Sequence, residues 1–285
     1  MNSISNTLSP QQIVAANIAA AKGKTQLPLL RMILLGMFAG MFIACGASAS
    51  SVAMHAVPNV GLARLIAGAV FPVGLMMIVF VGGELFTGDC LMVMGLLHRE
   101  YRLTELLRVL AVVFVSNFAG AVLLAAMVNA TTQFDFSGNM LGAFTIKVAM
   151  GKVGMSFGAA FVSGILCNFF VCAAVLMAAA AKDIAGKVWA IFFPILAFVV
   201  SGYEHCVANM YYVPAGIFAA GNPAYAEAAI TAYGYTAAQM ESLNWGNFLV
   251  NNLVPVTLGN IVGGMIFVGL PLYLIHAEKI KAECV

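Results

Sequence analysis

The sequence predicts an all-α integral membrane protein with six transmembrane helices, which form two inverted three-helix repeats and are broken in the second and fifth helices. Three observations support this fold. They are a very apolar composition, six apolar segments long enough to cross a membrane, and a matched pair of interruptions within two of these segments.

The composition is that of a chain surrounded mainly by lipid. Hydrophobic residues make up 62% of the sequence and charged residues only 8%, whereas soluble domains average roughly 25% charged residues. Residues 32–63 contain no Asp, Glu, Lys or Arg, and this stretch exceeds the ~20 residues that a transmembrane helix needs. Comparable segments recur along the chain, so we expect a multi-pass membrane protein.

The predicted membrane spans divide the chain into three parts. The spans are 29–54, 65–97, 107–128, 153–181, 188–219 and 247–276. They define a membrane domain (27–276), whose repeats cover 29–128 and 153–276, between an N-terminal segment (1–26) and a short tail (277–285).

The N-terminal segment predicts a short amphipathic helix. Ser9 and Pro10 suit a helix cap and a first helical residue, and Val14 and Ile18 then fall on one face. This face could lie on the membrane surface or against another subunit. Residues 1–26 lack the basic start and apolar core of a signal peptide, so we expect no cleaved leader.

The distribution of cations predicts that both termini are cytoplasmic and that the protein lies in the cell membrane. Six spans place both termini on one side, and that side carries ten of the 13 Lys and Arg residues. They are Lys22, Lys24, Arg31, Arg99, Arg102, Arg108, Lys182, Lys187, Lys279 and Lys281. The opposite side holds Arg64, Lys147 and Lys152, and cytoplasmic loops are the ones enriched in Lys and Arg.

The second and fifth spans are interrupted in the same way. Each contains a Phe-Pro pair, ending at Pro72 or Pro194, and later a glycine stretch followed by Glu84 or Glu204. Non-helical backbone at membrane depth is tolerated only where it is buried in protein or lines a cavity, because lipid offers no hydrogen bonds. The paired interruptions therefore predict a central pathway.

The third and sixth spans also correspond. Asn117-Phe-Ala-Gly120 resembles Asn260-Ile-Val-Gly263. The correspondences imply two repeats of three helices, and because three is odd, the second repeat must be inverted in the membrane. The longer second repeat has its extra residues in an outer loop, 220–246.

Four motifs together resemble the formate/nitrite transporter family over nearly the whole chain. They are Gly-Glu-Leu-Phe-Thr at 83–87, Gly-Tyr-Glu-His at 202–205, Ala-Asn-Met at 208–210 and Pro-Val-Thr-Leu-Gly-Asn at 255–260. The resemblance implies homopentamers of aquaporin-like subunits. Each subunit would have its own pore for formate, nitrite, hydrosulfide or lactate.

His205 and Thr87 are the first candidates for the substrate pathway. His205 lies in the second interruption, where a group that titrates near neutrality could meet an anion, although a membrane histidine can also be simply packed and hydrogen-bonded. Thr87 could offer a hydroxyl to an oxyanion and could also cap the helix that restarts after the first interruption. The resemblance makes His205 the central pore histidine and places Thr87 opposite it.

Glu84 and Glu204 need internal partners, because an isolated carboxylate in apolar surroundings is costly. We expect them to support the broken helices, together with Leu85 and Phe86, rather than to contact an anion that they would repel. The amides that could serve the interruptions and the pathway are Asn168, Asn209 and Asn260.

Lys152 is expected at the outer start of the fourth span, where a lysine is usually an interface anchor. The resemblance instead suggests a vestibule lysine that gathers anions. It also nominates Leu75 and Phe198, with Phe71 as a weaker candidate, as hydrophobic constrictions above and below His205.

These residues suggest a mechanism for a weak acid. A bare anion in an apolar constriction pays a desolvation cost of several kcal/mol or more. Protonating an acid with a pKa of about 4 at pH 7 costs only ~4 kcal/mol. We expect Lys152 to attract the anion, a proton to reach it through or under the influence of His205, and the neutral acid to pass Leu75 and Phe198.

Formate is the favoured substrate because it is frequent in the family that the chain resembles and because of the Gly-Glu-Leu-Phe-Thr motif at 83–87. A nitrite or hydrosulfide channel, or a proton-coupled secondary transporter, is the alternative. The expected partners are the anion, protons, membrane lipid and further copies of the chain, and not nucleic acid.

Other classes of protein are disfavoured. A water or glycerol channel would carry two Asn-Pro-Ala boxes, whereas residues 222–224 supply one, which we interpret as a turn. The chain contains no dinucleotide, Walker, zinc-protease or hydrolase motif in a supporting context, so we expect no enzyme. Its six cysteines form no CxxC pair, and no metal or cofactor is predicted. A membrane enzyme or cofactor-binding subunit is disfavoured because His205, the histidine at the interruption, has no set of histidine or cysteine partners.

Overall fold

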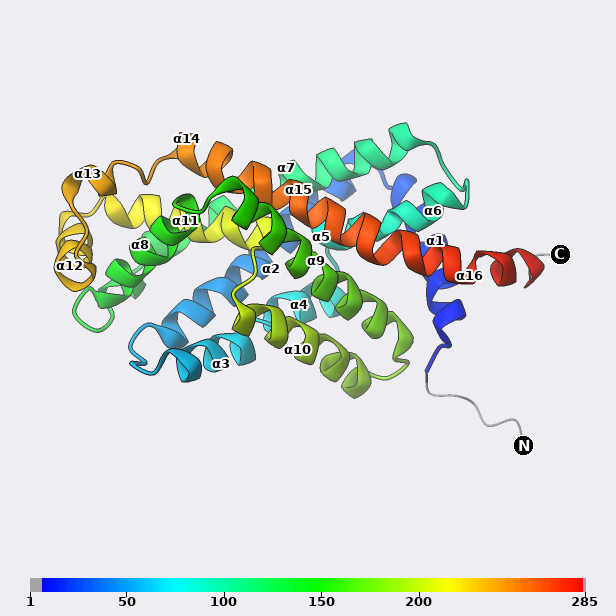
Figure 1. Ribbon diagram of the computed structural model, residues 1–285, viewed down its shortest axis with the longest axis horizontal. Helices are drawn as coiled ribbons and strands as arrows, with labels where there is room; N and C mark the ends of the chain where they lie inside the picture. The colour runs from blue at the N-terminus through cyan, green and yellow to red at the C-terminus, as the bar shows by residue number, and fades with distance from the viewer. Residues whose placement is uncertain (1–6, 284–285) are drawn as a thin grey trace.

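A computed structural model describes the backbone of residues 7–283 and the side chains of residues 7–276 as a bundle of helices (Figure 1). The helices are α1 (Pro10–Thr25), α2 (Leu29–Met54), α3 (Val60–Val70), α4 (Val73–Val81), α5 (Phe86–Asp89), α6 (Val93–Leu97), α7 (Leu103–Asn129), α8 (Met140–Val153), α9 (Phe157–Ala180), α10 (Ile184–Ser201), α11 (Cys206–Ala220), α12 (Pro223–Tyr233), α13 (Ala237–Met240), α14 (Trp245–Asn247), α15 (Val254–Val262) and α16 (Leu270–Glu283). Short 3₁₀ turns cover Cys90–Met92 and Gln133–Asp135, and π-helical segments cover Phe248–Leu253 and Gly263–Gly269.

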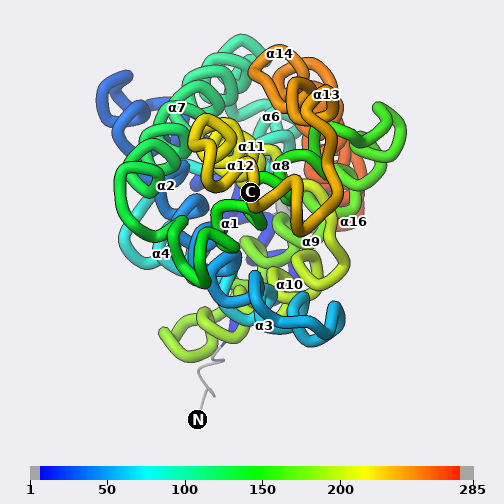
Figure 2. The backbone as a smooth tube through the Cα atoms, turned by 90° about the vertical axis from the view of Figure 1, so that its left-hand side faces the viewer, coloured from blue at the N-terminus to red at the C-terminus, as the bar shows by residue number. Residues whose placement is uncertain are grey.

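The long helices run roughly parallel to one another between two ends of the bundle. In Figure 1, α1 and the end of α16 lie at the right, and α12 and α13 lie at the left. These ends are called the α1 side and the α12 side below. The end-on view in Figure 2 places α11 close to the middle of the bundle, where it packs against α2, α7 and α8.

Within residues 7–283, six helices are long and apolar enough to cross a membrane. They are Leu29–Met54, Val60–Val81, Leu103–Asn129, Phe157–Ala180, Ile184–Ser201 and Trp245–His276. The second and fifth are completed by shorter apolar helices, Phe86–Leu97 and Cys206–Ala220. The prediction of six spans with broken second and fifth helices is therefore confirmed.

A glycine in a left-handed conformation ends the first half of each broken helix. Gly82 follows α4 with φ 105°, and Gly202 follows α10 with φ 74°. Glycine adopts positive φ without the steric cost that a side chain imposes. The chain can therefore leave the helix sharply at these two points, and residues 83–85 and 203–205 are non-helical.

The first and third spans of each repeat touch through glycines. A Cβ added to Gly120 of α7 would lie 2.1 Å from the carbonyl oxygen of Met37 in α2. A Cβ added to Gly259 of α15 would lie 2.1 Å from the carbonyl oxygen of Phe161 in α9. Small residues allow membrane helices to approach closely, and the matching contacts link the first and third spans in both inverted repeats.

Three details of the predicted organisation differ from the structure. Lys152 lies in the last turn of a separate helix, α8, because the fourth span begins only after the cap Ser156. The loop 220–246 contains α12 and α13. The triplet at 222–224 is not a turn, because the Asn222 side chain caps α12 and Pro223 is its first helical residue.

The N-terminal helix has the predicted cap but a different neighbour. Ser9 and Gln12 form a reciprocal capping box at the start of α1. The apolar face with Val14 and Ile18, which we expected to meet lipid or another subunit, packs against this chain's own α6, α9 and α16. Residues 1–6, the tail side chains including Lys279 and Lys281, and Cys284 lie outside the described residues.

The glycine contacts generate a stability prediction. Gly120→Val would force its side chain against the Met37 carbonyl, and overpacking of this kind costs about 1–3 kcal/mol. We expect a lower thermal unfolding midpoint in detergent. Gly158→Val is the matched control, because a Cβ at that position would meet nothing within 4 Å. A Gly120→Val protein as stable as this control would contradict the close contact of α2 and α7.

Candidate functional site

A hydrogen bond between His205 and Thr87 joins the two broken helices at the centre of the bundle. His205 Nε2 lies 3.1 Å from Thr87 Oγ1, and both side chains are buried. The other ring nitrogen, Nδ1, accepts from the Ala208 N–H at 3.1 Å. A neutral imidazole that accepts at Nδ1 carries its proton on Nε2. His205 therefore donates to Thr87 Oγ1, and the hydroxyl proton of Thr87 is not used in this hydrogen bond.

Thr87 does not cap the restarting helix as we predicted. Leu85 is the N-cap residue of α5, Phe86 is its first residue, and no side chain caps this end. The Thr87 hydroxyl is engaged by His205 instead. In the second repeat, the His205 side chain does cap its helix, α11.

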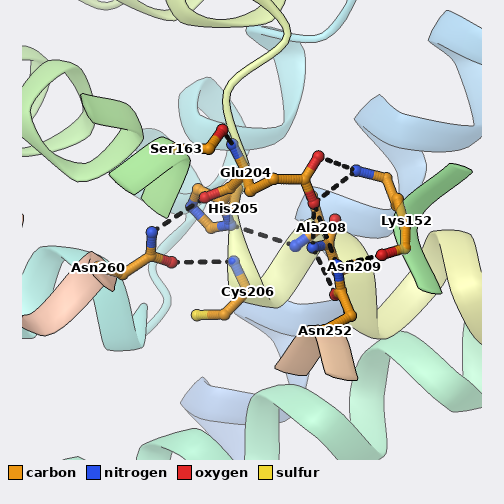
Figure 3. A network of polar contacts seen from close by, with 9 residues as sticks. All are labelled: Lys152, Ser163, Glu204, His205, Cys206, Ala208, Asn209, Asn252 and Asn260. Atoms are coloured by element: carbon orange, nitrogen blue, oxygen red, sulfur yellow. Dashed lines mark hydrogen bonds and ion pairs between the residues drawn. The ribbon is translucent and has the colours of Figure 1, made fainter. Parts of the chain in front are cut away.

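One asparagine holds each unwound segment. In the second repeat, Asn260 Nδ2 donates to the Glu204 carbonyl oxygen at 3.0 Å, and its Oδ1 accepts from Cys206 N–H at 2.9 Å (Figure 3). Asn260 Nδ2 also donates to the Gly164 carbonyl oxygen at 2.8 Å. The fully buried amide therefore satisfies backbone groups on both sides of the interruption.

Asn117 makes the same three contacts in the first repeat. Its Nδ2 donates to the carbonyl oxygens of Gly36 at 2.7 Å and Glu84 at 2.9 Å, and its Oδ1 accepts from Phe86 N–H at 3.0 Å. We had matched Asn117 with Asn260 in the repeat but had not placed it in the site. The match itself was the signal that could have identified it.

The Glu204 carboxylate is the centre of a polar cluster on the α12 side (Figure 3). Lys152 Nζ lies 2.9 and 3.1 Å from its two oxygens. Asn209 Nδ2 donates to Oε2 at 2.6 Å, and Asn252 Nδ2 lies 3.4 Å from the same oxygen. The Glu204 N–H donates to Ser163 Oγ at 3.1 Å. Burial of this carboxylate is thus offset by an ammonium group and two amides.

A second cluster occupies the equivalent place on the α1 side. Lys24 Nζ of α1 lies 2.6 Å from Glu84 Oε2 and 2.5 Å from Asp89 Oδ1. Neither Lys24 nor Asp89 belongs to the predicted site. Asp89 follows Glu84 at the same spacing as Asn209 follows Glu204, and this repeat spacing could have identified Asp89 as a site residue. Lys24 lies far from both carboxylates in the sequence, so no pattern pointed to it.

Asn168 links the two repeats and does not border the cavity described below. Its Nδ2 donates to the carbonyl oxygens of Thr87 at 3.1 Å and Asn260 at 2.7 Å. The side chain is fully buried. Of the three predicted amides, Asn209 is the one that borders the cavity.

A cavity of about 590 Å³ leads from the α12 side to His205. Phe71 and Phe198 also line it, with ring centroids 5.6 Å apart and edge to face. The Phe198 ring also stacks on His205 at 6.1 Å. Leu75 is buried but does not line this cavity. Two aromatic rings therefore line the cavity together with the imidazole.

The cavity wall carries an excess of positive charge. Arg64, Lys147 and Lys152 line it, and among the described residues Glu204 is its one acidic side chain. Lys152 is paired with Glu204, whereas Lys147 lies over the Tyr233 ring at 4.6 Å. Arg64 donates to the Val200 carbonyl at 3.4 Å. The uncompensated charge thus comes from Arg64, to which we had assigned no role, and from Lys147, which we had interpreted as an interface anchor.

The sequence model of the formate/nitrite transporter family matches residues 11–274. This chain belongs to the formate/nitrite transporter family. The probable formate transporter of Methanothermobacter thermautotrophicus is 38% identical over 278 residues, which cover 91% of this chain and 94% of that protein. The formate channel FocA of Haemophilus influenzae is 37% identical over 212 residues, which cover 74% and 73% of the two chains.

Solved structures agree with this family assignment. A pentameric formate channel with formate bound has a TM-score of 0.77 at 35% identity, over 87% of this chain and 98% of that chain. An ion channel of the same family has a TM-score of 0.75 at 26% identity, over 93% and 98% of the chains. This family member is therefore a multi-pass membrane channel for small anions and not an enzyme.

The asparagine contacts of the family member generate a second prediction. Asn260→Leu would leave one N–H and two carbonyl groups buried without this partner, at about 1–3 kcal/mol each. We expect a lower unfolding midpoint and loss of anion flux. Asn251→Leu, on an exposed position of the same span, is the control. Equal stability of the two variants would show that the amide does not hold the interruption.

Proposed function

We propose that this protein conducts formate across the cell membrane as a weak acid that loses its charge in the pore. The observation that carries the proposal is the buried Thr87–His205 hydrogen bond, which lies between two unwound helices at the end of a cation-lined cavity. The formate-specific names of two relatives and one structural neighbour support formate over nitrite and hydrosulfide.

The first step of the proposed pathway is attraction of the anion. Arg64, Lys147 and Lys152 raise the local anion concentration in the cavity, since a narrow space with low-dielectric walls focuses their field. Lys152 is already paired with Glu204, which keeps it from holding the anion as a tight, isolated ion pair would.

The second step is loss of charge at the aromatic pair. Phe71 and Phe198 offer no hydrogen bonds to replace water, so the anion becomes less stable relative to its acid as it approaches them. Protonation of formate at pH 7 costs about 4 kcal/mol, which is less than complete desolvation of the ion.

His205 acts in this proposal as a neutral hydrogen-bond donor. Because its Nδ1 already accepts from the Ala208 N–H, a proton added there would set two donors against each other. The proton is therefore drawn from water of the cavity under the influence of the His205–Thr87 pair. The free Thr87 hydroxyl proton can then bind an oxygen of the acid. Leu75, one turn beyond Phe71, forms the next apolar barrier.

We also propose a homopentamer with α1 on the cytoplasmic side. The structural neighbour with formate bound is a pentamer. Large apolar side chains are exposed on α2, including Leu30 and Phe38, and need lipid or a neighbouring subunit. The excess of Lys and Arg on the α1 side favours a cytoplasmic location for that side.

Formate uptake into proteoliposomes tests the central pair. We expect His205→Asn to lose most of the flux, because the asparagine cannot reproduce both contacts of the ring. His55→Asn is the matched control, since His55 also lines the cavity but bonds near its mouth to Val52 and Ser137. Wild-type flux in His205→Asn would overturn the proposal, and faster nitrite or hydrosulfide flux would change the substrate.

The pH dependence tests loss of charge. At constant total formate, uptake limited by the neutral acid rises as the pH on the side of entry falls, by up to about tenfold per unit above the pKa of the acid. A conducted bare anion would show no such rise. Lys152→Glu should lower uptake at every pH, because it replaces the ammonium with a second carboxylate beside Glu204.

The outer cations generate a separate prediction. Arg64→Gln and Lys147→Gln should lower uptake from dilute formate at low salt, and the deficit should shrink as the Debye length falls from about 10 Å at 0.1 M to 3 Å at 1 M. Lys187→Gln, at the start of α10 on the α1 side, is the charge-matched control. A deficit that does not depend on salt would mean that these residues act through structure and not through their field.

A further inference from the structure

The cluster on the α1 side holds more negative charge than its cation can balance. Lys24 contacts both Glu84 and Asp89. Among the described residues, no other cation lies within salt-bridge distance of either carboxylate. The Asp89 side chain is 0% exposed and that of Glu84 is 11% exposed. Two buried carboxylates therefore share one ammonium group.

One oxygen of Asp89 has no partner. Asp89 Oδ1 contacts Lys24, but Oδ2 is buried without any hydrogen bond. A buried oxygen of an ionised carboxylate needs donors, and leaving it without them costs free energy that water would otherwise have supplied. The geometry is thus unfavourable for an ionised Asp89 and suits a protonated one.

The inverted repeat shows what a balanced cluster contains. There, Asn209 occupies the position of Asp89 and donates a hydrogen bond to Glu204 Oε2 at 2.6 Å. Lys152, Glu204 and Asn209 supply one ammonium, one carboxylate and one neutral donor. Asp89 can become a neutral donor only by carrying a proton. A protonated Asp89 would make the two clusters equivalent in charge and would give each of them a neutral donor at this position.

The remaining groups around Asp89 do not replace that proton. The titratable side chains that face it are Lys24 from α1, Glu84 from the interruption, Cys90 from the adjoining turn, Cys172 from α9 and Tyr101 from the following loop. Tyr101 donates its hydroxyl proton to the Met92 carbonyl. Cys172 points its thiol at the Thr87 carbonyl, and Cys90 points its thiol at the Phe86 carbonyl.

We propose that Asp89 is a proton-binding site on the α1 side of the pore, which exchanges its proton with solvent past the partly exposed Lys24. The role of this proton rests on the proposed function. When formic acid reaches the α1 side, Asp89 first passes its proton to water, and the resulting carboxylate accepts the proton that the acid releases as it becomes formate. In the opposite direction, Asp89 releases a proton to formate. The site lies two residues from Thr87 and therefore adjoins the central pair.

Infrared difference spectroscopy of the full-length protein in lipid tests the site directly. We expect the carbonyl stretch of a buried, protonated carboxylic acid, which disappears as the pH is raised and shifts in D₂O. Asp89→Asn, which copies Asn209 of the other repeat, should abolish this band. Glu227→Gln, on an exposed position of α12, is the control and should retain it. Absence of the band in the wild type, or its survival in Asp89→Asn, would overturn the proposal.

A second variant, Glu84→Gln, tests the site even if Asp89→Asn does not fold. Glu84→Gln removes the neighbouring negative charge, so the Asp89 band should persist and disappear at a lower pH than in the wild type. An unchanged titration in Glu84→Gln would contradict a proton held within this cluster.

Transport measurements then separate the proton site from its role. In oriented proteoliposomes, Asp89→Asn should lose the response of formate flux to pH on the α1 side and keep the response to pH on the α12 side. A band that titrates in a protein without formate flux would support the site and overturn the proposed substrate. An unchanged response in Asp89→Asn would overturn the role of Asp89 in transport.

Discussion

Backbone groups released where a helix unwinds inside a membrane must find hydrogen-bond partners within the protein, because lipid offers none. Asn117 and Asn260 meet this requirement in the two repeats with the same set of one accepted and two donated hydrogen bonds. Once the unwound segments are held, Thr87 and His205 face each other across the bundle. The site therefore depends on side chains that do not themselves touch it.

The same constraint explains the charged residues at membrane depth. Each unwound segment contains a glutamate, and each glutamate is paired with a lysine from a helix that precedes the repeat, α1 or α8. The repeat unit thus comprises four elements and not the three that span the membrane. Charge is not distributed equally between the halves, since Asp89 stands where the other repeat has Asn209.

Local signals in the sequence were sufficient for the six spans and their interruptions. Both repeats have a glycine that ends the first half-helix, α4 or α10, and an Asn–Gly pair in the third or sixth span. These residues recur because both repeats must end a helix inside the membrane and hydrogen-bond the backbone groups that this releases. His205 was found because a titratable group lies in the second interruption, and Thr87 because it offers a hydroxyl in the first and the family resemblance places it opposite His205. Lys24 could not be found, because its partner Glu84 is brought to it only by the fold.

The helix boundaries failed for a different reason. Hydropathy does not separate α8 from the fourth span, since both are apolar, and the cap Ser156 is an inconspicuous residue. The predicted cap at Thr87 was wrong because the Thr87 hydroxyl is hydrogen-bonded to His205 instead of to the backbone of its own helix. Competition between a local and a distant partner cannot be decided from spacing along the chain.

The π-helical segment at Phe248–Leu253 has a consequence for comparing this chain with its relatives. Asn252 lies in that segment with its amide 3.4 Å from the Glu204 carboxylate, whereas Asn260 in the following α15 donates to the Glu204 backbone carbonyl. In a regular α-helix, residues eight apart differ in direction by roughly 80°. A one-residue deletion in this segment would turn the residues before it by roughly 100° about the helix axis. It would thereby move the Asn252 amide away from the Glu204 carboxylate.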